Sequence, residues 1–328
     1  MSGRNSRECG TVLRLAGNIA RKASTISLVV GLVSGSAAVG WAQSADSAMP
    51  SLNFSGVGLS PPSFSLLGNE VSSDFAYLVD NVQLDAEDIV TSPLYIASPN
   101  SVFRSRKFYL ALAGVGAIWG GAFALDQTMR SHLRSMGHNN ATMLQDISYG
   151  SVSAATGLLY AYGLYRNDSQ ARQLALTAGE AAGVATLLDI GIKAAFGRLR
   201  PRQDGHSHTQ FFDHGASFVS GDVTPMFALA TGVSEYFNNE WYASVPIYSL
   251  ALLDGFGRMG NDAHWFSDVV GAALLGSLST ELFIYLHKRH EEEPSRWRIL
   301  PYAPPPVPTG RTTMQNMMPT GLEVAYSW

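Results

Sequence analysis

The sequence is poor in cysteine, in charged residues and in recognisable metal-binding spacings. Its 328 residues include one cysteine, so neither an intrachain disulfide nor a cysteine metal cluster can form. Charged residues make up only 15% and hydrophobic residues 46%, which is apolar for a soluble globular protein. The net charge of -4, with no basic tract beyond the N-terminus, argues against a nucleic-acid partner. The eight histidines show no HExxH spacing, so the sequence gives no support for a metal site.

Residues 1–42 have the pattern of a secretory signal peptide. Basic residues gather in residues 1–22, whereas residues 23–42 carry no charge and end in the small-x-small pattern Gly-Trp-Ala. We therefore expect cleavage at the end of this segment and an exported, periplasmic protein. An uncleaved membrane anchor is the alternative.

The rest of the chain predicts an all-α fold, a bundle of about six helices. Residues 43–106 are rich in Ser, Pro, Asn and Asp, so we expect an irregular N-terminal arm with one or two short helices. A helical domain is expected over residues 107–290, because its apolar segments lack the alternation of half-buried strands. Residues 291–328 hold a proline-rich linker and a short C-terminal β segment, one strand that pairs with WRILPY. The six segments are about 107–129, 144–165, 170–196, 223–237, 241–256 and 266–288.

The sequence leaves the relation of this bundle to the membrane open. Residues 108–125 and 147–165 are uncharged and long enough to span a bilayer. Acidic residues interrupt the other four segments, namely Glu180, Asp189, Glu235, Asp254 and Glu281. We expect a soluble or peripherally membrane-attached exported domain, since buried helices of a soluble bundle can be this apolar. An integral membrane bundle is the alternative.

Residues 258–268, RMGNDAHWFSD, carry side chains suited to catalysis. His264 and Asp268 are four residues apart, so on a helix they share one face and the carboxylate can hold the imidazole. A neutral histidine held in this way is fixed in one tautomer and made more basic, as a nucleophile or general base requires. Arg258 adds a permanent cation. The alternative is an ordinary surface hydrogen bond between the two side chains.

Two further clusters carry groups that can bind an anion. The segment KAAFGRLRPR contains Lys193 and Arg200, whose ammonium and guanidinium groups can converge on a tetrahedral oxyanion. The segment SFVSGDVTP places Ser220 and Gly221 before a helix, where backbone N–H groups and a hydroxyl form an anion cradle. Solvated basic residues at a helix C-terminus and a plain N-cap are the alternatives, and spacing alone does not decide.

Taken in order, the three clusters resemble the signature of a known family, the type 2 phosphatidic acid phosphatase superfamily. That family includes bacterial acid phosphatases and vanadium haloperoxidases, and the resemblance covers roughly residues 107–288. It implies the helical bundle of that family. The matching motifs are Lys193-x6-Arg200-Pro201, Ser220-Gly221 and Arg258-x5-His264-x3-Asp268.

The resemblance also implies a role for each cluster in binding phosphate. Lys193, Arg200 and Arg258 would bind the phosphate oxygens and stabilise the charge of the transition state. Ser220 and the amide of Gly221 would add hydrogen bonds to the same oxygens.

The chemistry implied by the resemblance centres on a histidine nucleophile. His264 would attack phosphorus to give a phosphohistidine intermediate, and Asp268 would orient the ring. Water would then release phosphate. Neither a metal nor another cofactor would be needed for hydrolysis, because the three cations take the place of a metal ion.

The chain departs from the family pattern at two positions. Asp222 stands where the family has the histidine that protonates the leaving oxygen, and Gly257 stands where it has a serine. Asp222 could act as this acid only when protonated, and neighbouring cations favour its ionised form. Three outcomes stay open: Asp222 works as an acid at low pH, a loop histidine replaces it, or the site binds anions with little turnover. The loop histidines are His206, His208 and His214.

We therefore expect a metal-independent phosphatase acting on a phosphomonoester or pyrophosphate, either a small molecule or a lipid phosphate. Pyrophosphates suit the site because their leaving groups need less protonation. One alternative is a degenerate phosphate-binding or structural member of the family. Another is a vanadium haloperoxidase, with vanadate as cofactor and His264 as its ligand. Asp222 disfavours the haloperoxidase as well, since those enzymes also rely on a histidine there.

Overall fold

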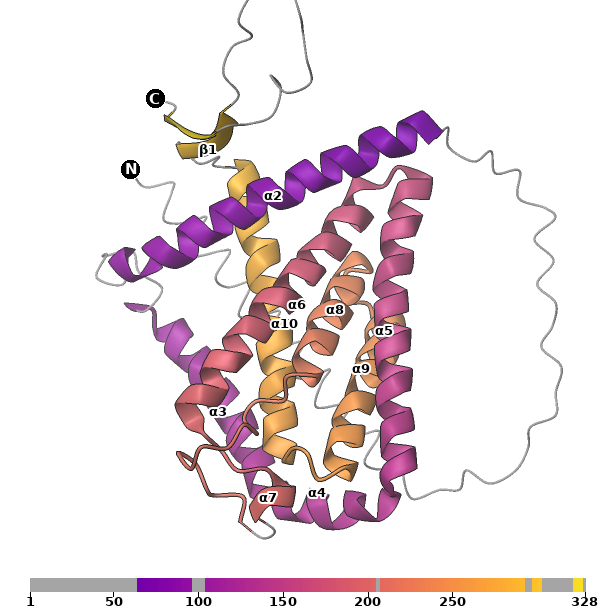
Figure 1. Ribbon diagram of the computed structural model, residues 1–328, viewed down its shortest axis with the longest axis vertical. Helices are drawn as coiled ribbons and strands as arrows, with labels where there is room; N and C mark the ends of the chain where they lie inside the picture. The colour runs from indigo at the N-terminus through magenta and orange to yellow at the C-terminus, as the bar shows by residue number, and fades with distance from the viewer. Residues whose placement is uncertain (1–63, 96–103, 205–206, 293–296, 303–320, 327–328) are drawn as a thin grey trace, which may run out of the picture.

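The computed structural model describes residues 64–95, 104–204, 207–292, 297–302 and 321–326 (Figure 1). Most of the described chain is helical. The helices are α2 (Phe64–Tyr95), α3 (Arg106–Ala124), α4 (Asp126–Leu133), the 3-10 turn η2 (Arg134–Met136), α5 (His138–Arg166), α6 (Ser169–Phe196), α7 (Pro201–Asp204), α8 (Val223–Tyr236), α9 (Trp241–Gly260) and α10 (Phe266–Glu292). Strands β1 (Trp297–Tyr302) and β2 (Gly321–Tyr326) pair antiparallel, with Trp297 opposite Tyr326.

The mostly helical fold predicted from the sequence is confirmed. Five of the six apolar segments correspond to α5, α6, α8, α9 and α10, while the first is divided between α3 and α4. The division falls at Leu125, whose N–H bonds back to the Ala122 carbonyl at 3.0 Å and closes α3. The count of six is not confirmed, because the described chain also contains α2, α4 and α7. The predicted signal peptide lies outside the described residues.

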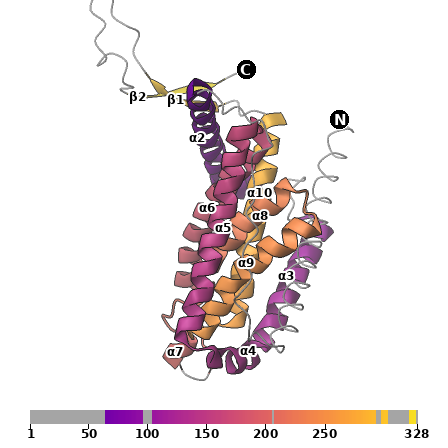
Figure 2. The ribbon, with the colours of Figure 1, turned by 90° about the vertical axis from the view of Figure 1, so that its right-hand side faces the viewer.

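Helix α8 lies at the centre of the bundle and contacts α5, α6, α9 and α10. It can do so because its side chains are apolar or small on every face, and Val223, Met226 and Phe227 are all buried. The approach of α10 is so close that a Cβ at Gly276 would lie 2.1 Å from the Thr224 carbonyl oxygen. A glycine is therefore required at that crossing. Helix α3 lies at the edge of the bundle and contacts α10 (Figure 2).

The expected irregular arm is wrong for the part of it that forms α2. This helix of 32 residues contacts α6 and α10 and runs across them in Figure 1. Residues 69–92 contain neither Gly nor Pro, so the Ser, Asn and Asp residues that suggested turns lie on one continuous helix. Two of the aspartates form polar contacts with the bundle. Asp74 accepts a hydrogen bond from Arg172 Nε at 3.1 Å, and Asp85 Oδ2 lies 2.8 Å from His287 Nε2.

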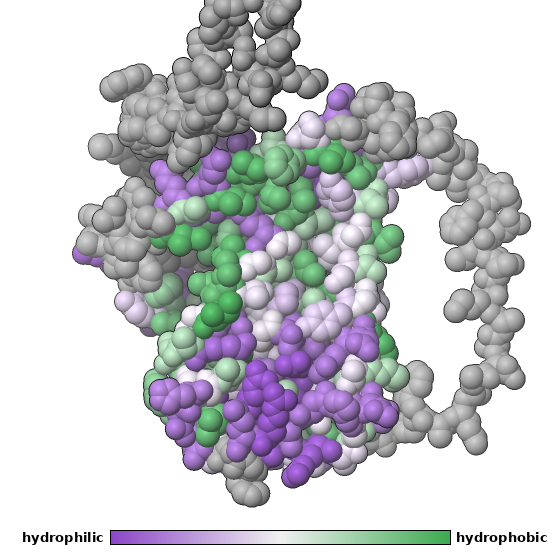
Figure 3. Space-filling view, in the orientation of Figure 1, coloured by the Kyte–Doolittle hydropathy of each residue, from purple (hydrophilic) through white to green (hydrophobic). Residues whose placement is uncertain are grey.

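Three of the described helical segments are long and apolar enough to cross a membrane: α3, the segment Ser169–Gln203 that contains α6, and α10. Large apolar side chains on the outside of the bundle are exposed, including Leu110 at 61% and Leu187 at 67%. On the face shown in Figure 3, apolar surface covers much of the upper half, and hydrophilic surface gathers at the end where α4 and α7 lie. This distribution is compatible with membrane association.

Gly276→Ala should lower the midpoint of thermal unfolding. The added methyl group would collide with the backbone of α8, and overpacking of this kind costs about 1–3 kcal/mol. Gly157→Ala on the exposed face of α5 is the matched control, since no neighbouring atom lies within 4 Å of its Cβ position. Helix propensity should make that variant as stable as wild type or up to about 1 kcal/mol more stable. Equal stability of the two variants would contradict the described packing of α8 on α10.

Candidate active site

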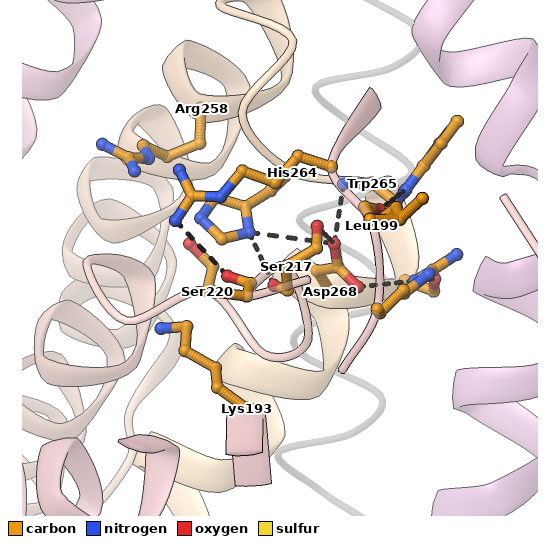
Figure 4. Close-up of polar contacts among 12 residues, drawn as sticks. Lys193, Leu199, Ser217, Ser220, Arg258, His264, Trp265 and Asp268 are labelled. Carbon is orange, nitrogen blue, oxygen red and sulfur yellow. Dashed lines mark hydrogen bonds and ion pairs between the residues drawn. The ribbon is translucent and has the colours of Figure 1, made fainter. Parts of the chain in front are cut away.

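The three sequence clusters meet at one end of the bundle (Figure 4). Lys193 lies in the last turn of α6, Gly221 lies just before α8, and His264 lies between α9 and α10. A Cβ at Gly221 would lie 2.7 Å from Lys193 Nζ, so the first cluster touches the second. Asp222 Oδ2 lies 2.7 Å from Arg258 Nη2, which joins the second cluster to the third. Residues far apart in the chain thus form one charged site.

His264 is buried and precedes α10 instead of lying on it. Its Nδ1 lies 2.8 Å from the Ser217 carbonyl oxygen, whereas Asp268 Oδ2 is 3.7 Å from the same nitrogen. The nearer partner is therefore a backbone carbonyl, not the carboxylate expected from the spacing. Because a carbonyl can only accept, Nδ1 carries the proton and Nε2 carries the lone pair. Burial lowers the pKa of His264, and the charges of Arg258 and Arg200 lower it further, whereas Asp268 opposes the shift; the net lowering favours the neutral ring.

Asp268 is wholly buried and holds the backbone around His264. It accepts hydrogen bonds from Ser217 Oγ at 2.5 Å, from the Trp265 N–H at 2.9 Å and from Arg198 Nη1 at 2.5 Å. Ser217 also supplies the carbonyl that fixes the imidazole, so Asp268 positions the ring in part through Ser217. The sequence pattern found Asp268 but not this intermediary.

Arg198 lies in the first cluster, but no role for it was predicted from the sequence. Its side chain is wholly buried, with Nη2 2.6 Å from Asp126 Oδ2 and Nη1 2.5 Å from Asp268 Oδ1. Nη2 also donates to the His208 carbonyl at 2.7 Å. Arginine is almost never buried unless it is paired, so this guanidinium serves as an internal link and not as a phosphate ligand. The sequence shows it only as one arginine among three and carries no signal of its burial.

Polar atoms without hydrogen-bond partners among the described residues lie within the site. They include the hydroxyl of Ser220, which is wholly buried, and Nε of Arg258. Lys193 Nζ pairs with Asp189 at the end of α6. Arg200 Nη2 donates to the Ala216 carbonyl at 3.3 Å. A buried hydroxyl and a guanidinium N–H beside an ammonium group can together accept the oxygens of an anion.

Asp254 is a second carboxyl group near Asp222 that the sequence analysis did not place in the site. It lies on α9 one turn before Arg258, and neither of its oxygens has a hydrogen-bond partner among the described residues. Burial, and then the charge of Asp222, raise the pKa of Asp254 to about 7. Asp222 itself is ion-paired with Arg258. The site therefore contains one ion-paired carboxyl group and one carboxyl group that exchanges its proton near neutral pH.

The loop histidines do not meet the nucleophile in the part of the chain that is described. His206 lies outside the described residues. His208 Nδ1 contacts Gln127 Nε2 at 3.3 Å, and its ring lies against Phe123, with 4.8 Å between the ring centroids. His214 is exposed, with a positive φ of 55°. The second departure from the family pattern, Gly257, has a steric cause, since a Cβ there would lie 2.4 Å from the Ala141 carbonyl oxygen.

Comparison with known proteins identifies the family. A family model described as the PAP2 superfamily matches residues 174–292. This segment belongs to the PAP2 superfamily. The PAP2 segment contains all three clusters, so the family predicted from their order is confirmed. It ends where α10 ends, and α2 to α5 lie outside it.

A lipid A 1-phosphatase of Porphyromonas gingivalis is similar to part of this chain. The two sequences are 35% identical over 118 residues, which make up 36% of this chain and 24% of the relative. The match thus spans about a quarter of the relative's length. No solved structure matches this chain.

Arg198→Met should destabilise the protein by about 3–5 kcal/mol, because two buried carboxylates would lose their shared cation. The measurement is thermal or denaturant unfolding of the purified protein. Arg202→Met is the matched control, since Arg202 is exposed and only four residues away. If the two variants unfold at the same temperature, Arg198 does not link the elements of the site as described.

Proposed function

We propose that this protein is a phosphatase that hydrolyses a phosphomonoester or pyrophosphate through a phosphohistidine at His264. The observation that carries this proposal is a neutral, buried imidazole beside three cationic side chains. Nδ1 of His264 donates to a carbonyl at 2.8 Å, which directs the nucleophilic lone pair to Nε2.

The reaction consists of two displacements at phosphorus. In the first, His264 Nε2 forms a bond to phosphorus, the bond to the leaving oxygen breaks, and that oxygen takes up a proton. Lys193, Arg200 and Arg258 stabilise the charge on the phosphoryl oxygens, and the Ser220 hydroxyl donates to one of them. In the second, water attacks the phosphohistidine, inorganic phosphate leaves, and the neutral ring is restored.

The proton for the leaving oxygen comes from Asp254, the carboxyl group near Asp222. Asp222 Oδ2 lies 2.7 Å from Arg258 Nη2. Asp254 retains a proton up to about pH 7, because burial raises its pKa. The proton of Asp254 would replace the one that the family's second-motif histidine supplies.

The substrate class we propose is a lipid-linked phosphate. The relative is named a lipid A 1-phosphatase, and three apolar segments of this chain are long enough to cross a membrane. In such a setting the apolar outer surface would contact acyl chains, while the polar end in Figure 3 would face the phosphate group. We also propose export to the periplasm. This part of the proposal comes from the sequence pattern of residues 1–42, which lie outside the described residues.

A phosphate-binding protein with little turnover is the second candidate. The ion pair between Asp222 and Arg258 favours it, because it engages one of the cations and places a negative charge where a phosphate dianion would bind. The two functions differ in one measurement, the release of inorganic phosphate.

His264→Ala should abolish hydrolysis of an aryl phosphate by the purified protein, because no other residue would form the phosphorus–nitrogen bond. Lys193→Ala or Arg200→Ala should lower kcat/KM by on the order of a hundredfold or more, through lost transition-state stabilisation. Arg202→Ala should leave the rate unchanged. Wild-type turnover in His264→Ala would exclude the mechanism, and phosphate binding without turnover in the wild type would favour the second candidate.

The pH profile of kcat/KM should fall as the pH rises through about 7, because Asp254 then loses the proton that the leaving oxygen needs. On the acid side, activity should persist below 6.5, the ordinary pKa of histidine, because burial lowers the pKa of His264. Asp254→Asn should lower kcat and remove the alkaline limb. Asp146→Asn on the exposed face of α5 should change neither. If the activity of Asp254→Asn still falls at alkaline pH, the alkaline limb belongs to a group other than Asp254.

A further inference from the structure

A second cluster of ionisable side chains lies at the other end of α10. Asp85 and Asp88 are three residues apart on α2, and His287 and His290 are three residues apart on α10, so each pair shares one helix face. His290 follows the first residue of α10, beside the nucleophile, by 24 positions. At about 1.5 Å per residue, the cluster is roughly 36 Å from the phosphate site.

Two buried atoms in this cluster face each other without a hydrogen bond. Asp85 Oδ1 and His290 Nδ1 are 3.8 Å apart, and neither has a hydrogen-bond partner among the described residues. That separation is too long for a hydrogen bond. The other ring nitrogen, Nε2 of His290, lies 2.9 Å from Asp88 Oδ2 and therefore carries the N–H. The lone pair of Nδ1 is thus directed at a carboxylate oxygen, an arrangement that a cation between the two atoms would stabilise.

We propose that a divalent transition-metal ion such as Zn²⁺ binds here between Asp85 Oδ1 and His290 Nδ1, with water completing its coordination. Asp88 lies on the other side of the His290 ring, where Oδ2 pairs with Nε2 and with Arg289 Nη2, so it orients the imidazole and does not bind the ion. Zinc binds imidazole nitrogen and carboxylate oxygen at about 2.0–2.2 Å, so two ligand atoms of one ion are separated by roughly 3.4 Å at a tetrahedral angle and by somewhat more at wider angles. The 3.8 Å between Asp85 Oδ1 and His290 Nδ1 fits one shared ion.

The surroundings orient these ligands. His287 Nε2 lies 2.8 Å from Asp85 Oδ2 and 3.3 Å from Glu180 Oε2, so the imidazole occupies one oxygen of Asp85 and leaves Oδ1 for the ion. His287 Nδ1 in turn lies 3.0 Å from the hydroxyl oxygens of both Tyr77 and Thr177. Metal-binding carboxylates and imidazoles are usually held by outer hydrogen bonds of this kind.

A pocket lies next to His287, and an ion in the cluster would have a structural consequence. A pocket of about 200 Å³, lined in part by Tyr77, Thr177 and His287, lies beside the cluster. The buried residues in the described part of α2 are Asp74, Asn81 and Asp85, all of them polar. Burial of apolar side chains therefore holds α2 weakly, and the ion would fasten it to α10.

The test is metal binding by the purified full chain after treatment with a chelator. We expect the wild type to bind one equivalent of Co²⁺, with the visible absorption of a tetrahedral or five-coordinate ion, and one equivalent of Zn²⁺ that raises the unfolding temperature. Asp85→Asn and His290→Gln should weaken Zn²⁺ binding by at least about tenfold. Asp80→Asn, an exposed carboxylate on the same helix, is the matched control and should bind as the wild type does.

Each outcome decides the proposal. A wild-type chain that takes up neither ion overturns it, and the cluster is then a network of ion pairs alone. Undiminished binding by the variants overturns the assignment of these ligands. Asp88→Asn weakens the acceptor that orients the His290 ring and should also weaken Zn²⁺ binding; with 27% of its side chain accessible, Asp88 can be changed even if Asp85→Asn fails to fold. Phosphatase activity is measured separately, since the metal site is remote from His264.

Discussion

The buried guanidinium of Arg198 is the interaction on which the candidate active site depends. Its two ion pairs join Asp126, at the start of α4, to Asp268, in the first turn of α10. Asp126 also accepts the N–H of Ser267 at 2.7 Å, so it caps the helix that follows the nucleophile. Removing such a charge from water is unfavourable unless every partner is in place, so α4, α10 and the loop before α8 must assemble together.

This assembly explains how an apolar bundle can hold a reactive histidine. Asp268 secures Ser217, and the Ser217 carbonyl secures His264, so the imidazole is fixed by a chain of contacts that ends at Arg198. Lys193 and Arg258, which lie on α6 and α9, are on the other side of the ring from Asp268 in Figure 4. Two arginines of one short segment thus differ in their surroundings. Arg198 forms buried ion pairs that join helices, whereas Arg200 lies in the candidate site.

The sequence was sufficient for features whose signal is local. Apolar segments gave the main helices, and motif order gave the family. The missed features depend on tertiary environment. Asp254 seemed only to interrupt an apolar segment, because its raised pKa comes from burial in the folded bundle. The carbonyl of Ser217 has no side-chain signature, and α2 was obscured by residues that also favour turns. Asp85 and His290 are more than 200 residues apart, so no spacing could link them.

The position of the site relative to the apolar outer surface has a consequence for how a substrate reaches it. The polar end of the bundle adjoins apolar surface on the face shown in Figure 3, and large apolar side chains such as Leu110 and Leu187 are exposed on the described helices. For a substrate anchored in a bilayer, this arrangement lets the phosphate reach the cations while its acyl chains stay among other lipids. Such a substrate would reach the site by diffusing in the plane of the membrane. Its acyl chains would stay in lipid, so their transfer from water would contribute nothing to the free energy of binding.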